Sequence, residues 1–159
     1  EYIAGGSTHG YLKSKPNRRL DENSARKVFC QLVSALQYLH SKCIAHRDIK
    51  LENVMLDEQR NVKLMILDLA LKYQTLNGET FLWNTIIHGP RNRAKIGVFG
   101  PPTDVYASGV LLFAFFCGQF PYKGANDKEL YKKIATAELN LPDHIPSAPR
   151  HLLKYMLKK

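Results

Sequence analysis

The sequence predicts a mainly α-helical fold with one small β-hairpin, and three observations lead to that prediction. Apolar residues recur at three- or four-residue steps in several segments, which is the period of an amphipathic helix. Two apolar runs at 54–56 and 62–67 flank the polar turn 57–61, as the two strands of a hairpin do. The stretch 105–117 is apolar on every side, so we expect a helix that is buried on every side.

The first long helix is expected to begin after Asp21 and to end near His40. An aspartate in this position can cap the helix, because its carboxylate accepts a hydrogen bond from a free backbone N–H. Steps of three or four residues then place four apolar side chains on one face: Val28, Leu32, Leu36 and Leu39.

A long loop is expected in the middle of the chain. Residues 72–102 show no regular period and contain turn signals at 77–78 and 89–90. A loop of this length inside a compact domain commonly serves a function.

Three helices are expected after the loop. The first is the central buried helix, at 103–117. Asp127 is expected to cap the second, and the third is expected to begin at Ser147 or Pro149.

The composition excludes several classes of protein. With 159 residues, of which 45% are hydrophobic and 23% are charged, the chain resembles one folded domain rather than a disordered segment. Its three cysteines form no Cys-x-x-Cys pair and its six histidines are scattered, which disfavours a disulfide framework or a zinc site. The longest apolar stretch falls short of the ~20 residues of a membrane span. Since no signal peptide is recognisable either, we expect an intracellular, cytoplasmic protein without a membrane span.

The net charge of +9 favours anionic partners, such as phosphates, nucleic acid or acidic membranes. Basic residues are spread along the chain, and only 91–95 and 158–159 form small clusters. No nucleic-acid-binding motif accompanies the charge. We therefore do not expect nucleic acid to be a partner.

The segment between the first helix and the hairpin carries the clearest chemical signal. It reads His46-Arg47-Asp48-Ile49-Lys50-Leu51-Glu52-Asn53. This run resembles the catalytic loop of protein kinases, H-R-D-x-K-x-x-N, with every functional residue type in place. Lysine at position 50 is similar to the serine/threonine type of kinase. The resemblance implies a protein-kinase-like domain over 1–159, made of the hinge and most of the large lobe.

The resemblance implies that this loop transfers the γ-phosphate of ATP to a protein hydroxyl. Asp48 would accept the proton of the hydroxyl, and Lys50 would neutralise the transferring phosphoryl group. Asn53 would bind Mg²⁺ through its amide oxygen. Phosphoryl transfer depends on positioning and charge neutralisation more than on covalent chemistry, which is why these residue types are needed together. ATP and Mg²⁺ are the implied cofactors, and a protein substrate or a regulatory protein is the implied partner.

Further segments extend the resemblance. Residues 1–6 are similar to a kinase hinge, where the Glu1 carbonyl and the Ile3 amide would meet the edge of adenine. Met55 would form the apolar floor beneath the adenine. Asp104 opens a run that resembles D-V-W-S-L-G-V at the start of the central helix, and this aspartate usually holds the backbone of the catalytic loop.

Residues 66–97 correspond to the activation segment of a kinase, in a degenerate form. Thr85 is the best match to a regulatory threonine, ahead of Thr75 and Thr80, and Arg47 could pair with a phosphate placed there. The resemblance gives His46 a structural role. Residues 131–142 are similar to the calmodulin-dependent and AMP-activated-like kinases.

Several positions depart from the family pattern. Aligned without a gap, D-F-G falls on 66–68, so the metal-binding aspartate is replaced by Ile66. Sliding the motif to Asp68 would move the carboxylate about 6–7 Å along a strand, and we disfavour it for that reason. No A-P-E triplet follows Gly89, and Ser7 stands where an acidic residue that contacts ribose is expected. No Gly-rich loop precedes the hinge, so we expect that the small lobe is absent.

Three functions remain open from the sequence. The first is a pseudokinase that binds proteins without transferring phosphate, as the loss at Ile66 indicates. The second is a fragment or diverged copy of an active serine/threonine kinase, as the intact Asp48, Lys50 and Asn53 indicate. The third is a basic module that binds nucleic acid or acidic membranes. We expect the first.

Overall fold

The computed structural model describes residues 2–66, 70–76, 79–82 and 100–158. Its helices are α1 (Thr8–Lys13), the 3₁₀ turn η1 (Pro16–Arg18), α2 (Glu22–Ser41), α4 (Pro101–Cys117), α5 (Asp127–Thr136) and α6 (Ser147–Met156). Its strands are β1 (Ile44–Ala45), β2 (Val54–Leu56), β3 (Val62–Leu64), β4 (Leu71–Leu76) and β5 (Glu79–Leu82). The predicted mainly helical fold is confirmed.

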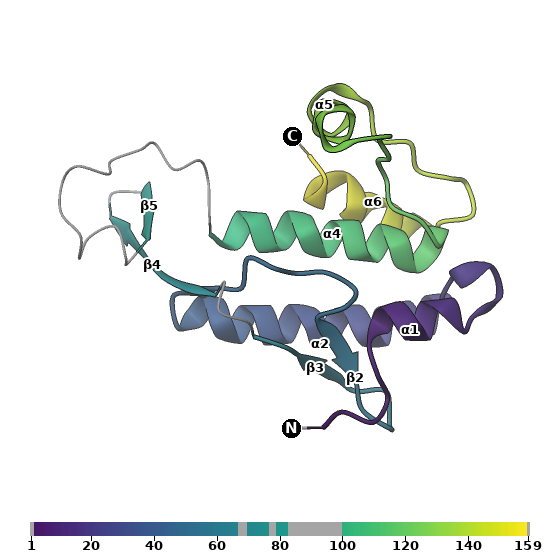
Figure 1. Cartoon of the computed structure of the whole chain (residues 1–159), viewed down its shortest axis with the longest axis horizontal. Helices are drawn as coiled ribbons and strands as arrows, with labels where there is room; N and C mark the ends of the chain where they lie inside the picture. The colour runs from purple at the N-terminus through teal and green to yellow at the C-terminus, as the bar shows by residue number, and fades with distance from the viewer. Residues whose placement is uncertain (1, 67–69, 77–78, 83–99, 159) are drawn as a thin grey trace.

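The two longest helices, α2 and α4, form the centre of the fold (Figure 1). The β2–β3 hairpin packs on the side of α2 away from α4, and α6 packs on the other side of α4. One hydrophobic cluster joins these layers, and Leu32 and Phe115 in its centre have no solvent exposure. This cluster fixes the position of the loop between β1 and β2.

Helix α2 follows its prediction closely. Its N-cap is Asp21, whose Oδ1 accepts a hydrogen bond from the backbone N–H of Ser24 at 2.9 Å. The four apolar residues predicted to share a face are all buried: Val28, Leu32, Leu36 and Leu39. A polar cap and a helical apolar period were sufficient to define this element.

Helix α4 begins earlier than predicted, and it is buried only in part. Pro101 stands at its first position, where a proline costs no hydrogen bond. Every residue from Leu111 to Cys117 is buried, but Val105 is 42% exposed. The expectation of burial on every side is therefore wrong for the first half of the helix, because no described element covers Val105.

The predicted hairpin is confirmed as β2 and β3, which pair antiparallel with Val54 opposite Leu64. Strand β3 ends at Leu64, earlier than the predicted 67. A second sheet, in the order β1-β4-β5, lies partly in the segment 72–102 that was predicted to be irregular. That prediction is wrong for 72–76 and 79–82, because β4 pairs with the distant strand β1 and local sequence carries no signal of this partner.

Helix α1 was not predicted, and the caps of the last helices agree only in part. Ser7 caps α1 through its hydroxyl, and the Thr8 hydroxyl donates to the Leu51 carbonyl at 2.7 Å. The N-cap of α5 is Asn126 instead of the expected Asp127, while α6 begins at Ser147 as expected. Within the described ranges, we find no helix with the length and hydrophobicity needed to cross a membrane.

Candidate active site

The backbone of the loop predicted to be catalytic is held by one buried carboxylate. Asp104, in the first turn of α4, has no solvent exposure. Its Oδ2 accepts a hydrogen bond from the His46 N–H and its Oδ1 accepts one from the Arg47 N–H, each at 2.8 Å. The ring of His40, at the end of α2, lies 2.8 Å from Oδ2. Because a carboxylate can only accept, His40 donates through Nε2.

Arg47 has an unusual backbone conformation at this point. Its φ of 66° is in the left-handed region, which costs a residue other than glycine about 1–2 kcal/mol. The hydrogen bond from its N–H to Asp104 holds it there. A strained residue held by a buried carboxylate is a feature of sites whose geometry matters for function.

His46 orients the loop through both nitrogens of its ring, which is 1% exposed. Its Nδ1 lies 3.2 Å from the backbone N–H of Asp48, and its Nε2 lies 2.6 Å from the Met65 carbonyl. Since the amide of Asp48 must donate, Nδ1 accepts and Nε2 carries the proton. The His46 ring therefore connects the loop to Met65, the residue before Ile66.

Asp48, Lys50 and Asn53 come together within the loop, where Asn53 is buried. The Lys50 ammonium and the Asn53 amide nitrogen each lie 2.8 Å from Oδ2 of Asp48. The Asn53 amide also donates to the Asp48 carbonyl at 2.8 Å. Among the described residues no hydrogen bond is formed to Oδ1 of Asp48, and a carboxylate oxygen of this kind can accept from a hydroxyl group.

The same contacts set the ionisation of Asp48. The hydrogen bond from Lys50 lowers the pKa of Asp48 below its ordinary value, and the bond from Asn53 acts in the same direction, while partial burial opposes both. Asp48 is therefore a carboxylate at neutral pH. A negative oxygen beside an ammonium group is suited to orient a substrate hydroxyl next to a phosphoryl group.

The segment predicted to be the hinge lies along β2. The Gly6 carbonyl accepts from the Leu56 N–H at 2.8 Å, and Ser7 pairs with Met55 in an isolated bridge. Gly5 approaches this strand so closely that a Cβ atom would lie 2.2 Å from the Leu56 carbonyl oxygen. Ile3 and Met55 are both partly exposed here. Glu1, the other residue predicted to contact adenine, lies outside the described residues.

The described residues fit Mg²⁺ only in part. Asn53 uses its amide nitrogen on Asp48, which leaves its amide oxygen as a candidate ligand. Ile66, aligned with the metal-binding aspartate of the family, offers a hydrocarbon side chain that is 57% exposed. Within the described ranges no group of three or more His, Cys, Asp or Glu side chains could hold a metal. Asp68 and the predicted regulatory Thr85 lie outside those ranges.

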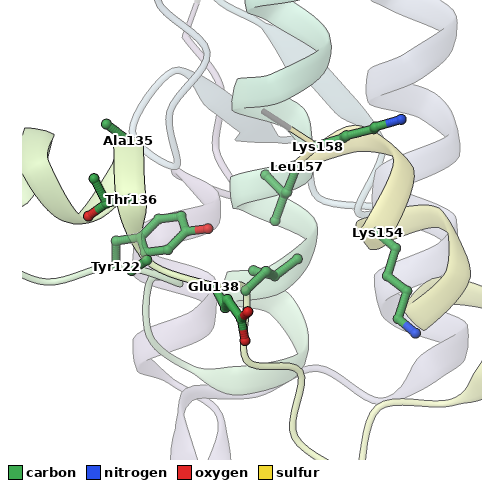
Figure 2. Close-up of a pocket in the computed structure, with 9 residues that line it drawn as sticks. Tyr122, Ala135, Thr136, Glu138, Lys154, Leu157 and Lys158 are labelled. Carbon is green, nitrogen blue, oxygen red and sulfur yellow. The ribbon is translucent and has the colours of Figure 1, made fainter.

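One cavity, shown in Figure 2, is lined by no residue of this loop. It has a volume of about 380 Å³ and is lined by residues of α5 and α6 with Tyr122 and Glu138. A smaller one of about 190 Å³ lies between α2, α4 and α6. Neither is lined by any of the residues predicted to bind nucleotide or metal or to carry out catalysis.

Sequence reasoning did not assign roles to His40 and Met65. His40 contacts Asp104, and Met65 contacts the loop twice through its backbone, since its N–H also donates to the Asn53 carbonyl at 2.9 Å. The partner of His40 is 64 residues away, and Met65 acts through atoms that every residue has. No local sequence signal could have identified either residue.

Comparison with known proteins agrees with this geometry. The chain is 35% identical over 161 residues to the SNF1-related protein kinase catalytic subunit alpha KIN12 of Arabidopsis thaliana, which covers 99% of this chain and 31% of that protein. It is 35% identical over 158 residues to the NUAK family SNF1-like kinase 1 of Mus musculus and of Homo sapiens, covering 99% of this chain and 24% and 23% of those proteins. The chain thus spans about a quarter to a third of the length of these relatives.

The family described as protein kinase domain matches residues 1–159. The predicted resemblance is confirmed: the chain belongs to the protein kinase family, of the serine/threonine type.

Proposed function

We propose that this chain is a serine/threonine-kinase-like domain in which phosphate transfer is impaired, and that it acts by binding proteins. One observation carries the proposal: Ile66 presents an exposed hydrocarbon at the position where the family pattern has its metal-binding aspartate. ATP and Mg²⁺ are the cofactors used in general by the family. Binding of either by this chain and a cytoplasmic location remain predictions.

The loss of one metal-binding carboxylate is expected to change the rate of phosphate transfer strongly. Two unit charges about 4 Å apart attract by ~4 kcal/mol at an effective dielectric of ~20, and a divalent metal doubles the charge on one side. Each 1.36 kcal/mol removed from transition-state stabilisation lowers a rate about tenfold. The absence of a carboxylate at position 66 is therefore expected to lower the rate of phosphate transfer by roughly three or more powers of ten.

A phosphotransfer assay tests the proposal. The chain is incubated with γ-labelled ATP, Mg²⁺ and a generic protein substrate, alongside an Asp48→Asn variant as the negative control. We expect the two proteins to incorporate label at the same background rate. Magnesium-dependent turnover that the Asp48→Asn change abolishes would contradict the proposal.

The second candidate is an active kinase, and one observation favours it. Lys50 and Asn53 both contact Oδ2 of Asp48, and among the described residues no hydrogen bond is formed to its Oδ1. The Ile66→Asp variant distinguishes the two candidates. If the loop is otherwise competent, this change alone should raise turnover above background, whereas an already active chain would gain little or lose activity.

A further inference from the structure

A basic surface lies at the end of helix α1 and in turn η1, and the β2–β3 hairpin contacts α1 here. Four of its cations lie within residues 13–19, and the turn of the hairpin supplies a fifth. We call these five residues the basic platform: Lys13, Lys15, Arg18, Arg19 and Arg60. The sequence alone did not indicate this cluster, because Arg60 lies more than 40 residues beyond the others. The platform shares no residue with the hydrogen-bonded cluster around Asp48.

Two of the five cations gather on one aromatic ring. The Lys15 ammonium lies 4.9 Å from the centre of the Tyr11 ring, and the Arg60 guanidinium carbon lies 4.2 Å from the same centre. Their charged groups are therefore within about 9 Å of each other. Cation–π contacts hold both in place but do not neutralise them. Two neighbouring positive charges in a fixed arrangement attract an anion more strongly than separate ones do.

The nearby aspartates form no ion pair with the platform among the described residues. Asp21 uses its two carboxylate oxygens to bind the backbone N–H and the hydroxyl of Ser24. Asp57 likewise uses both oxygens to bind the backbone N–H and the side-chain amide of Asn61. Among the described residues, no platform cation forms an ion pair. These positive charges are thus available to a partner.

The backbone beneath the platform is anchored to the core. The Leu20 N–H donates to the Phe115 carbonyl of α4 at 2.8 Å. Gly118, which ends α4, lies so close to the turn that a Cβ atom there would be 2.4 Å from the Asn17 carbonyl oxygen. Asn17 and Arg18 themselves have φ of 54°, as a tight turn requires. A partner would therefore meet a preorganised surface and would not have to order a loose segment.

We propose that the basic platform binds an acidic peptide segment of a partner protein. Arginine and lysine recognise carboxylates by charge-assisted hydrogen bonds, which suits a run of Asp or Glu. Binding to a membrane surface is disfavoured, because no large exposed hydrophobic residue lies in 8–19 or 57–61 to insert into lipid. Single-stranded nucleic acid is disfavoured, because Tyr11 is partly buried beneath two cations and cannot offer its ring for stacking.

Fluorescence anisotropy with a fluorescein-labelled peptide of ten glutamates tests this proposal at physiological salt. The test variant carries both Lys15→Gln and Arg60→Gln. The control is the pair Lys128→Gln and Lys132→Gln on α5, which removes the same charge from exposed cations outside the platform. Each protein is first checked by circular dichroism. The platform pair should weaken binding by roughly tenfold or more, and the control pair by less than about threefold.

Three results would overturn the proposal. The first is an equal loss in both variants, which means that only the net charge matters. The second is no binding of the peptide by the native chain. The third is platform-dependent binding of phosphatidylserine vesicles or of an oligouridylate in place of the peptide. None of these readouts measures phosphate transfer, so the outcome does not depend on the proposed loss of kinase activity.

Discussion

Asp104 is the residue that connects the fold to the site. It is fully buried, yet it accepts hydrogen bonds from two backbone N–H groups of the loop and from the ring of His40. A buried carboxylate without partners would be strongly destabilising, whereas one with several donors can be retained as an anion. The loop that carries Asp48 is thus held by α4, which lies in the hydrophobic core.

Replacing this carboxylate should loosen the loop. In Asp104→Asn the side-chain NH₂ group, which can only donate, would replace one carboxylate oxygen. At least one donor to Asp104 would then lose its acceptor, and we expect the free energy of unfolding to fall by about 2–4 kcal/mol. Urea unfolding measures the global loss, and hydrogen exchange of the His46 and Arg47 amides should accelerate. The exposed Asp143→Asn serves as the matched control, with an expected change below about 0.5 kcal/mol. Similar effects from both variants would contradict the role given to Asp104.

Residue spacing predicted part of the site and could not predict the rest. The catalytic-loop motif brought together Asp48, Lys50 and Asn53, whose contacts span only five residues. The contact between Asp104 and the loop was implied by family resemblance alone, since its partners lie more than 55 residues away. The role of His40 was missed for the same reason. Short-range contacts follow from sequence, whereas long-range ones need the packing of α2 against α4.

Among the elements, α2 is the clearest case in which local physics decides structure. Its predicted cap and apolar face are both present, and it packs against both α4 and β3. The strands β4 and β5 are the opposite case, because β4 depends on pairing with β1. Helix α1 also depends on a distant contact, between Thr8 and the Leu51 carbonyl. Elements with non-local partners were therefore the ones that pattern reasoning missed.

The cap of α2 gives a prediction at this scale. Asp21→Ala removes the acceptor for the Ser24 N–H and hydroxyl, and we expect it to lower the free energy of unfolding by about 1 kcal/mol. Asp21→Asn keeps a capping oxygen and should recover most of that loss. Thermal or urea unfolding of the three proteins provides the comparison. If alanine and asparagine destabilise equally, the helix does not depend on this cap.

For the whole molecule, the fold supports a kinase-type loop, and our alignment predicts that Ile66 replaces the metal-binding aspartate of the family. Helix α4, which packs against α2 and α6, holds the loop through Asp104, and the hinge-like segment lies along β2. The family and the helical architecture could be predicted from sequence because motif and periodicity agreed. The convergence of Arg60 and Lys15 on the ring of Tyr11 could not, because it arises from the meeting of α1 with the hairpin.

The measurement that tests the central claim most directly is the effect of Mg²⁺ on ATP binding. Isothermal titration of ATP is performed with and without Mg²⁺ on the native chain and on Ile66→Asp. For the native chain we predict that Mg²⁺ changes the affinity by less than about twofold, and for Ile66→Asp that it raises the affinity by roughly tenfold or more. An increase of tenfold or so caused by Mg²⁺ in the native chain would contradict the account, because a metal site would then be complete without a carboxylate at position 66.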